Sequence, residues 1–200
     1  LQSDYPLFLR KNEQQQFEPL ALLGFVEQEN LFLTSKGWDA AYIPLSIQRQ
    51  PFLIGFQTRM ENGIPQQHPV VCVDMAHPRV NRGHGEAVFL PQGGNSPYLK
   101  QITTILATIQ QGQLQNQKFV AALTEMDLIE PVTLEFTFAT QHRIDGIYTI
   151  NEPHLSQLKA EQLQQLHNQG YLQKIYMMIA SAINIRNMVR RKQGSMNAAG

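Results

Sequence analysis

Asp74, His77 and His84 are the residues whose types could build a metal site. They lie in the segment 74–85, where no helical or strand period is visible. Zinc and iron sites use imidazole and carboxylate ligands, with a geometry set by their spacing. The spacing here matches no established metal motif, and the alternative is that the two histidines lie in a solvated loop. We expect no cofactor, and a metal site formed by these three residues is only a hypothesis.

Trp38, Tyr42 and Arg49 could line a small-ligand pocket where sheet meets helices. Tryptophan and tyrosine offer large apolar faces with one polar handle, and arginine can hold a carboxylate or phosphate with two parallel hydrogen bonds. The alternative is structural: the two aromatic residues close the edge of the core and Arg49 caps backbone carbonyls. The sequence leaves both interpretations open.

The sequence around the cysteine and the serines gives little indication of a catalytic nucleophile. Cys72 lies in the apolar, β-branched run 70–73, where a thiol is an inert small hydrophobe. Ser46, Ser96 and Ser181 stand outside any Gly-x-Ser-x-Gly frame. The sequence also contains neither a phosphate-binding P-loop nor a Gly-x-Gly-x-x-Gly fingerprint. We predict no catalytic residue, and the sequence favours a protein that is not an enzyme.

Composition narrows the class of partner. The 200 residues are 42% apolar and 16% charged, with 16 basic and 16 acidic side chains. Without a net field there is no electrostatic case for nucleic acid or an anionic membrane as the main partner. No apolar run reaches the ~20 residues of a membrane span. A single cysteine fits a reducing compartment, so we expect a cytoplasmic protein, while a chain that begins at Leu1 leaves export open.

The first half of the chain predicts β-structure. Short apolar runs at 5–10, 17–25 and 31–34, joined by polar turns, are typical of an antiparallel meander. Residues 45–50 are long enough for one or two helical turns, which Pro51 ends. Further strands are predicted at 52–56 and 70–73.

The second half predicts mainly helix. Ser96 and Pro97 suit a helix start, and apolar spacing continues to about Asp127. Alternation over 132–138 predicts a half-buried strand with a hairpin partner at 146–150. A helix at 151–170 ends at Gly170, and a final helix spans 172–192. That helix is apolar on nearly every side, which predicts burial in the domain or self-association. Residues 193–200 are expected to be a disordered tail. The fold class is therefore α+β: a mainly antiparallel sheet packed by three or four helices in a single domain, 1–192.

Several short motifs follow one another in a fixed order. They are Tyr5-Pro6, Pro19-Leu20-Ala21-Leu22-Leu23-Gly24, Glu29-Asn30-Leu31-Phe32, Trp38 with Ala41-Tyr42-Ile43-Pro44, Arg49-Gln50-Pro51-Phe52, Val71-Cys72-Val73-Asp74, Gly85-Glu86 with Phe89, Pro97-Tyr98-Leu99 and Gly146-Ile147-Tyr148. In this order, from about Tyr5 to Val189, they resemble the SapC family of bacterial proteins. Two departures stand out. The family's segment before the Tyr-Pro pair is absent, and Met75-Ala76-His77-Pro78-Arg79 follows Asp74 where relatives tend to be acidic.

The resemblance implies an accessory role and no reaction. The family name is associated with a bacterial paracrystalline surface layer and serum resistance, and members often resemble companions of cupin-like hydroxylases and flavin-dependent halogenases. The family supplies no catalytic motif. We expect a non-catalytic accessory or binding protein whose partner is another protein, or a second copy, reached through the C-terminal helix. The alternatives are a ligand-binding protein or enzyme with a pocket near Trp38, Tyr42 and Arg49, and a structural protein of a surface layer.

Overall fold

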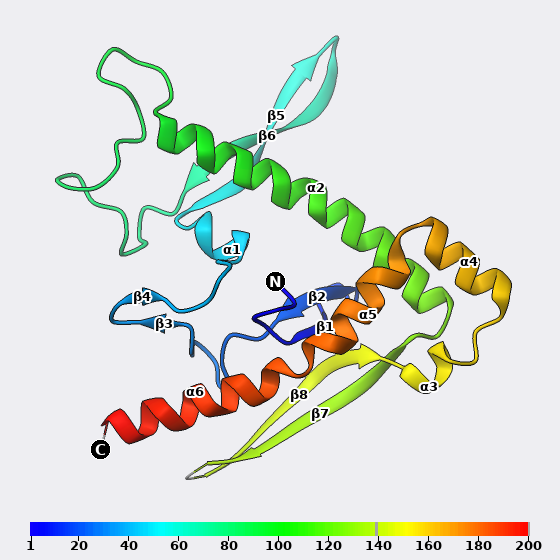
Figure 1. Cartoon of the computed structure of the whole chain (residues 1–200). Helices are drawn as coiled ribbons and strands as arrows, with labels where there is room; N and C mark the ends of the chain where they lie inside the picture. Colours follow the sequence, from blue (N-terminus) through cyan, green and yellow to red (C-terminus); the bar gives the residue numbers. More distant parts are fainter. Residues whose placement is uncertain (139, 200) are drawn as a thin grey trace. The chain divides into compact units, whose positions relative to one another are not determined.

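The chain divides into two compact units, each described here by itself. The computed structural model describes residues 1–138 and 140–199 (Figure 1). One unit comprises Leu1–Tyr42 and Gln115–Gly200, and the other Ile43–Leu114. Helix α2, Pro97–Glu125, contributes residues to both units. The predicted α+β class with antiparallel sheets is confirmed, while the assignment of residues 1–192 to one domain stays a prediction.

The first unit is built on a four-stranded antiparallel sheet in the order β2-β1-β8-β7. Its strands are β1 Leu7–Lys11, β2 Phe17–Ala21, β7 Ile129–Thr137 and β8 Gln141–Ile150. Each pair β1–β2 and β7–β8 is a hairpin, and the two hairpins meet where Leu9 pairs with Tyr148. The later hairpin, predicted from its alternation, is confirmed and extends the N-terminal one.

The predicted meander is wrong in its third strand. Residues 31–34 do not join the main sheet. Instead β3, Leu33–Thr34, pairs with β4, Gly37–Trp38. The physical reason is local: Gly37 adopts a φ of 108°, a conformation that glycine adopts at little cost, and so turns the chain straight back on itself.

The helices begin largely where the sequence predicts, but two of the predicted helices are each split into two. The Ser96 hydroxyl accepts a hydrogen bond from the Leu99 N–H at 3.1 Å, so the predicted start of α2 is confirmed. Gly112 does not interrupt this helix. The segment predicted as one helix at 151–170 forms two, α3 Glu152–Leu155 and α4 Ala160–Asn168. The predicted final helix likewise divides into α5 Tyr171–Ser181 and α6 Asn184–Ala199.

The C-terminal residues require a correction. Residues 193–199, expected to be a disordered tail, are helical as the end of α6, and Gly200 lies outside the described residues. Alanine, methionine and glutamine in this stretch are good helix formers that propagate an existing helix at little cost. In residues 1–138 and 140–199, no helix is both long and apolar enough to cross a membrane.

Both faces of the main sheet are covered. Neighbouring strand residues point to opposite faces. Leu9 and Ile150 therefore join one core with the second half of α2 and with α3 to α5. Phe8 and Ile147 join another core with Met188 of α6 and the segment after β2. Helix α5 packs against β1 and β8 (Figure 1), where the Ser181 hydroxyl accepts a hydrogen bond from the Leu7 N–H at 2.9 Å.

The second unit is a hairpin packed on a helix. It holds α1 Leu45–Gln48, β5 Phe52–Glu61, β6 Ile64–Val73 and the first part of α2. Phe52 and Leu99 lie in its core. The strands are longer than the predicted 52–56 and 70–73, because Asn62 and Gly63 adopt φ angles of 52° and 81° and close a two-residue turn.

Candidate functional site

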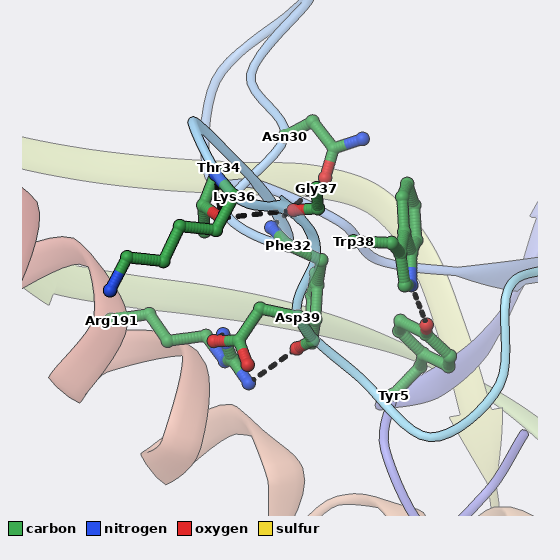
Figure 2. Close-up of polar contacts among 9 residues, drawn as sticks. All are labelled: Tyr5, Asn30, Phe32, Thr34, Lys36, Gly37, Trp38, Asp39 and Arg191. Carbon is green, nitrogen blue, oxygen red and sulfur yellow. Dashed lines mark hydrogen bonds and ion pairs between the residues drawn. The ribbon is translucent and has the colours of Figure 1, made fainter.

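A chain of hydrogen bonds fixes the N-terminal segment to the β3–β4 hairpin. Tyr5 is fully buried, and its phenol oxygen accepts a hydrogen bond from the Trp38 indole N–H at 2.8 Å (Figure 2). The same phenol donates to the backbone carbonyl of Tyr42. The Tyr5 ring also contacts Phe32, with 4.7 Å between centroids, and Phe32 stacks on Trp38 at 6.3 Å. This tyrosine thus satisfies two polar groups inside an aromatic cluster.

Burial changes the acidity of this tyrosine. Removal of the phenol from water raises the pKa of Tyr5 above its ordinary value, although the hydrogen bond from Trp38 partly opposes that shift. The phenol therefore stays neutral at physiological pH. A neutral phenol can both donate and accept a hydrogen bond, which its place between Trp38 and Tyr42 requires.

Helix α6 is fixed to the same hairpin by Arg191. Its guanidinium makes an ion pair with the Asp39 carboxylate and donates a second hydrogen bond to the Asp39 carbonyl oxygen at 2.8 Å. The guanidinium carbon lies 4.7 Å from the centroid of the Phe32 ring (Figure 2). Asp39 is held in turn by its own N–H, which donates to the Phe32 carbonyl at 2.7 Å. Arginine suits this position because its planar fork can pair with oxygen and stack on an aromatic face together.

Lys192 forms a second clamp with Glu29. Their side chains are only 19% and 15% exposed, and the other Glu29 oxygen accepts the Phe25 N–H at 2.8 Å. Burial alone would raise the pKa of Glu29, but the hydrogen bonds from Lys192 and Phe25 outweigh it and lower the pKa. Gly24 leaves room for this loop, since a Cβ there would lie 2.4 Å from the Glu29 carbonyl oxygen.

A surface hollow of about 330 Å³ lies beside these clamps. Polar side chains from three segments line it: Ser3, Asp4, Asp39, Asn187, Arg190 and Arg191. Of these, Arg190 is exposed and makes no ion pair with any described residue. Because Asp39 is already paired with Arg191, the hollow offers the Arg190 guanidinium and one carboxylate, that of Asp4, that makes no ion pair with a described residue.

The predicted pocket residues take different places. Trp38 and Tyr42 belong to the first unit. Trp38 is half-buried at the aromatic cluster, whereas the Tyr42 side chain is 38% exposed and contributes its backbone carbonyl. Arg49 belongs to the second unit, where its guanidinium donates to the Phe52 carbonyl at 2.7 Å. A ligand-binding role for the three residues stays a prediction.

Two of the three predicted metal ligands accept hydrogen bonds from backbone N–H groups of their own loop. The Asp74 carboxylate accepts the Ala76 N–H at 3.0 Å, and His77 Nδ1 accepts the Arg79 N–H at 3.2 Å. His84 lines a separate hollow of about 230 Å³ within the second unit. Over the described ranges, no three His, Cys, Asp or Glu side chains converge in a way that could hold a metal ion. The metal-site hypothesis therefore gains no geometric support.

Most residues of this site carry no recognisable sequence signal. Tyr5, Asp39 and Glu29 were not candidates, and the basic residues 190–192 are most simply interpreted from sequence as a solvated helix end. That interpretation fits Arg190 but not Arg191 and Lys192, whose side chains are 28% and 19% exposed. One sequence signal bears on this difference: successive helical residues are rotated by about 100°, so the three consecutive cations point in different directions.

The SapC family model matches residues 1–188, which include the aromatic cluster, β3, β4 and the first turn of α6. The two clamp residues Arg191 and Lys192 follow the matched range. No curated protein and no solved structure matches the chain.

Proposed function

This chain belongs to the SapC family, and we propose that it is a non-catalytic accessory protein that binds an acidic segment of a partner protein. The binding surface is the hollow beside α6 together with the basic stripe, by which we mean Arg186, Asn187, Arg190 and Gln193. These four residues are exposed, and their spacing of three and four places them along one side of the helix.

One observation carries this proposal. Of the four cations on α6, Arg191 and Lys192 are neutralised by Asp39 and Glu29. Arg186 and Arg190 have no carboxylate within ion-pair distance in the described part of the chain. The clamps thus hold the helix while Arg190 lies exposed at the hollow and Arg186 lies exposed one helical turn earlier. Because the helix that carries these arginines is already ordered, binding has to order only their side chains and not the backbone, which lowers the entropic cost of binding.

The described hydrogen bonds favour binding over catalysis. The Ser181 hydroxyl is used structurally, since it donates to the Met178 carbonyl and accepts from Leu7. Ser96 caps α2, and Cys72 lies half-buried within β6. No described serine or cysteine side chain is hydrogen-bonded to a histidine, the arrangement on which nucleophilic catalysis commonly depends.

The test is capture followed by charge reversal. The chain is used to capture proteins from its native host, and each captured protein is then purified and titrated directly. Arg190→Glu is expected to weaken the specific partner about tenfold or more, because a reversed charge repels an acidic segment. Lys118→Glu is the matched control: it reverses another exposed helical cation of the same unit and should leave the affinity unchanged. Equal affinities for both variants, or no protein that binds when purified, would refute the proposal.

A further inference from the structure

The strand edges of this protein differ in whether proline blocks their pairing with another chain. In an antiparallel pair, residues alternate between those bonded to the partner strand and those whose N–H and C=O point outward. Proline has no N–H, so a proline at an outward position blocks pairing with another chain. The main sheet ends in β2 and β7, which contain Pro19 and Pro131. The β6 edge of the second unit's hairpin contains Pro65 and Pro69. Strand β5 contains no proline.

The turn fixes which β5 residues face outward. Glu61 pairs with Ile64 directly across the two-residue turn, and the pair that flanks such a turn is hydrogen-bonded. Counting from this pair, Ile54, Phe56, Thr58 and Met60 of β5 turn their backbone groups away from β6. The same count places Pro65 and Pro69 outward on β6, where their missing N–H costs the hairpin nothing. Strand β5 thus has an outer edge without proline, whereas the outer edge of β6 contains two prolines.

The unpaired part of the β5 edge begins after Phe52. The Phe52 N–H donates to the Arg49 carbonyl, and its own carbonyl accepts from the Arg49 guanidinium, both at 2.7 Å. Within the described chain no backbone group pairs with the outward side of Ile54 to Met60. Two of the side chains on this stretch are apolar and open to solvent, since Phe56 is 63% and Met60 67% exposed.

We propose that the β5 edge pairs antiparallel with the β5 edge of a second copy of this chain, giving a closed dimer with the two-fold axis at Gln57. In this register Ile54 lies opposite Met60 of the second copy, and Phe56 lies opposite its Thr58. All four outward residues are then hydrogen-bonded, and Phe56 and Met60 each gain a cross-strand neighbour on their own face of the sheet. Arg59 lies opposite Gly55 of the second copy, so no like charges are directly opposed.

The same arrangement explains why association stops at two copies. The combined sheet has the order β6-β5-β5-β6, and both of its outer edges are β6. Pro65 and Pro69 block those edges, so no third copy can add. A self-complementary contact that uses both proline-free edges is an isologous, closed interface. This inference is independent of the partner-binding surface on α6.

The test compares two prolines placed across one strand pair. Thr58 and Gln67 are directly opposite each other, and the Gln67 amide donates to the Thr58 hydroxyl at 2.9 Å. Thr58→Pro and Gln67→Pro both remove this hydrogen bond, and both place proline at an outward position. Only Thr58→Pro blocks the β5 edge. Light scattering should give the unmodified chain and Gln67→Pro a mass of twice the 22.8 kDa of the single chain, and Thr58→Pro the monomer mass.

Cross-linking decides the register even if Thr58→Pro unfolds the hairpin. With Cys72 replaced by serine, Gln57→Cys should form a disulfide between copies, because two residues at a two-fold axis in a non-hydrogen-bonded pair lie about 4.5 Å apart at Cα. Gln66→Cys, on the same face of β6, should not. A monomeric chain, a dimer unaffected by Thr58→Pro, or equal cross-linking at both positions would overturn the proposal.

Discussion

At the residue scale, Tyr5 stabilises the fold by its hydrogen bonds as well as by its buried apolar area. Its phenol satisfies the Trp38 N–H and the Tyr42 carbonyl, and both would lose a partner without it. Tyr5→Phe should therefore destabilise the protein by about 1–3 kcal/mol, the usual cost of leaving buried polar groups unpaired. Urea unfolding followed by fluorescence measures this loss directly, because Trp38 is the single tryptophan.

The matched control is another tyrosine of the same unit. Tyr176 is 57% exposed and has no described side-chain hydrogen bond. Tyr176→Phe should change the free energy of unfolding by less than about 0.5 kcal/mol. If both substitutions cost the same, the Tyr5 hydroxyl contributes nothing specific.

The Glu29–Lys192 clamp predicts a pH dependence with a definite sign. The folded-state pKa of Glu29 is lowered from its ordinary value of 4.5, so folding favours the charged carboxylate. The resulting stability is fully present above pH 4.5 and is lost as the pH falls through the lower folded-state pKa. Glu29→Gln should cost about 1–3 kcal/mol at neutral pH and flatten the acid limb of the stability profile. A variant that keeps the full acid limb would show that another carboxylate is responsible.

At the element scale, two glycines with free space around them predict opposite effects. A Cβ would meet nothing within 4 Å at either Gly63 or Gly112. Gly63 has a φ of 81°, which an L-residue adopts only with strain, so Gly63→Ala should destabilise the β5–β6 hairpin by about 1 kcal/mol. Gly112 is helical, so Gly112→Ala should stabilise α2 by about 0.5–1 kcal/mol. Thermal unfolding of both variants checks the signs, and shifts in the same direction would contradict this account of the turn.

Local signals explain which elements the sequence predicts. The alternation that marks β7, the serine cap of α2 and the glycine after α4 each act within a few residues. The Asn62-Gly63 turn is an equally local signal, and it marks the point to which both strands of the β5–β6 hairpin extend. The sequence gives little local sign of the split between α5 and α6, because Ala182 and Ile183 favour helix as much as their neighbours do.

At the scale of the whole molecule, the site depends on contacts that leave no local trace. Asp39 and Arg191 are 152 residues apart, and Glu29 and Lys192 are 163 apart. Nothing near either partner predicts the other, so the sequence shows the basic cluster but not its division into clamped and available cations. The register in which β1 pairs with β8 leaves no local trace for the same reason. The family resemblance was accessible because it depends on motif order along the chain.

The balance of charge over the whole chain makes the proposed surface specific. With 16 basic and 16 acidic residues there is no general attraction for polyanions. Any preference for an acidic segment must therefore come from the geometry of the basic stripe, where Arg186 and Arg190 lie one helical turn apart.

A charge-swap cycle with the captured partner tests the central claim most directly. Once cross-linking has located the acidic residue nearest Arg190, that residue is changed to lysine and combined with Arg190→Glu. Each single change should weaken binding about tenfold or more, and the combined change should restore most of the affinity, because the ion pair is re-formed with its signs exchanged. Single changes whose losses simply add in the combined pair would contradict a direct contact between α6 and the partner.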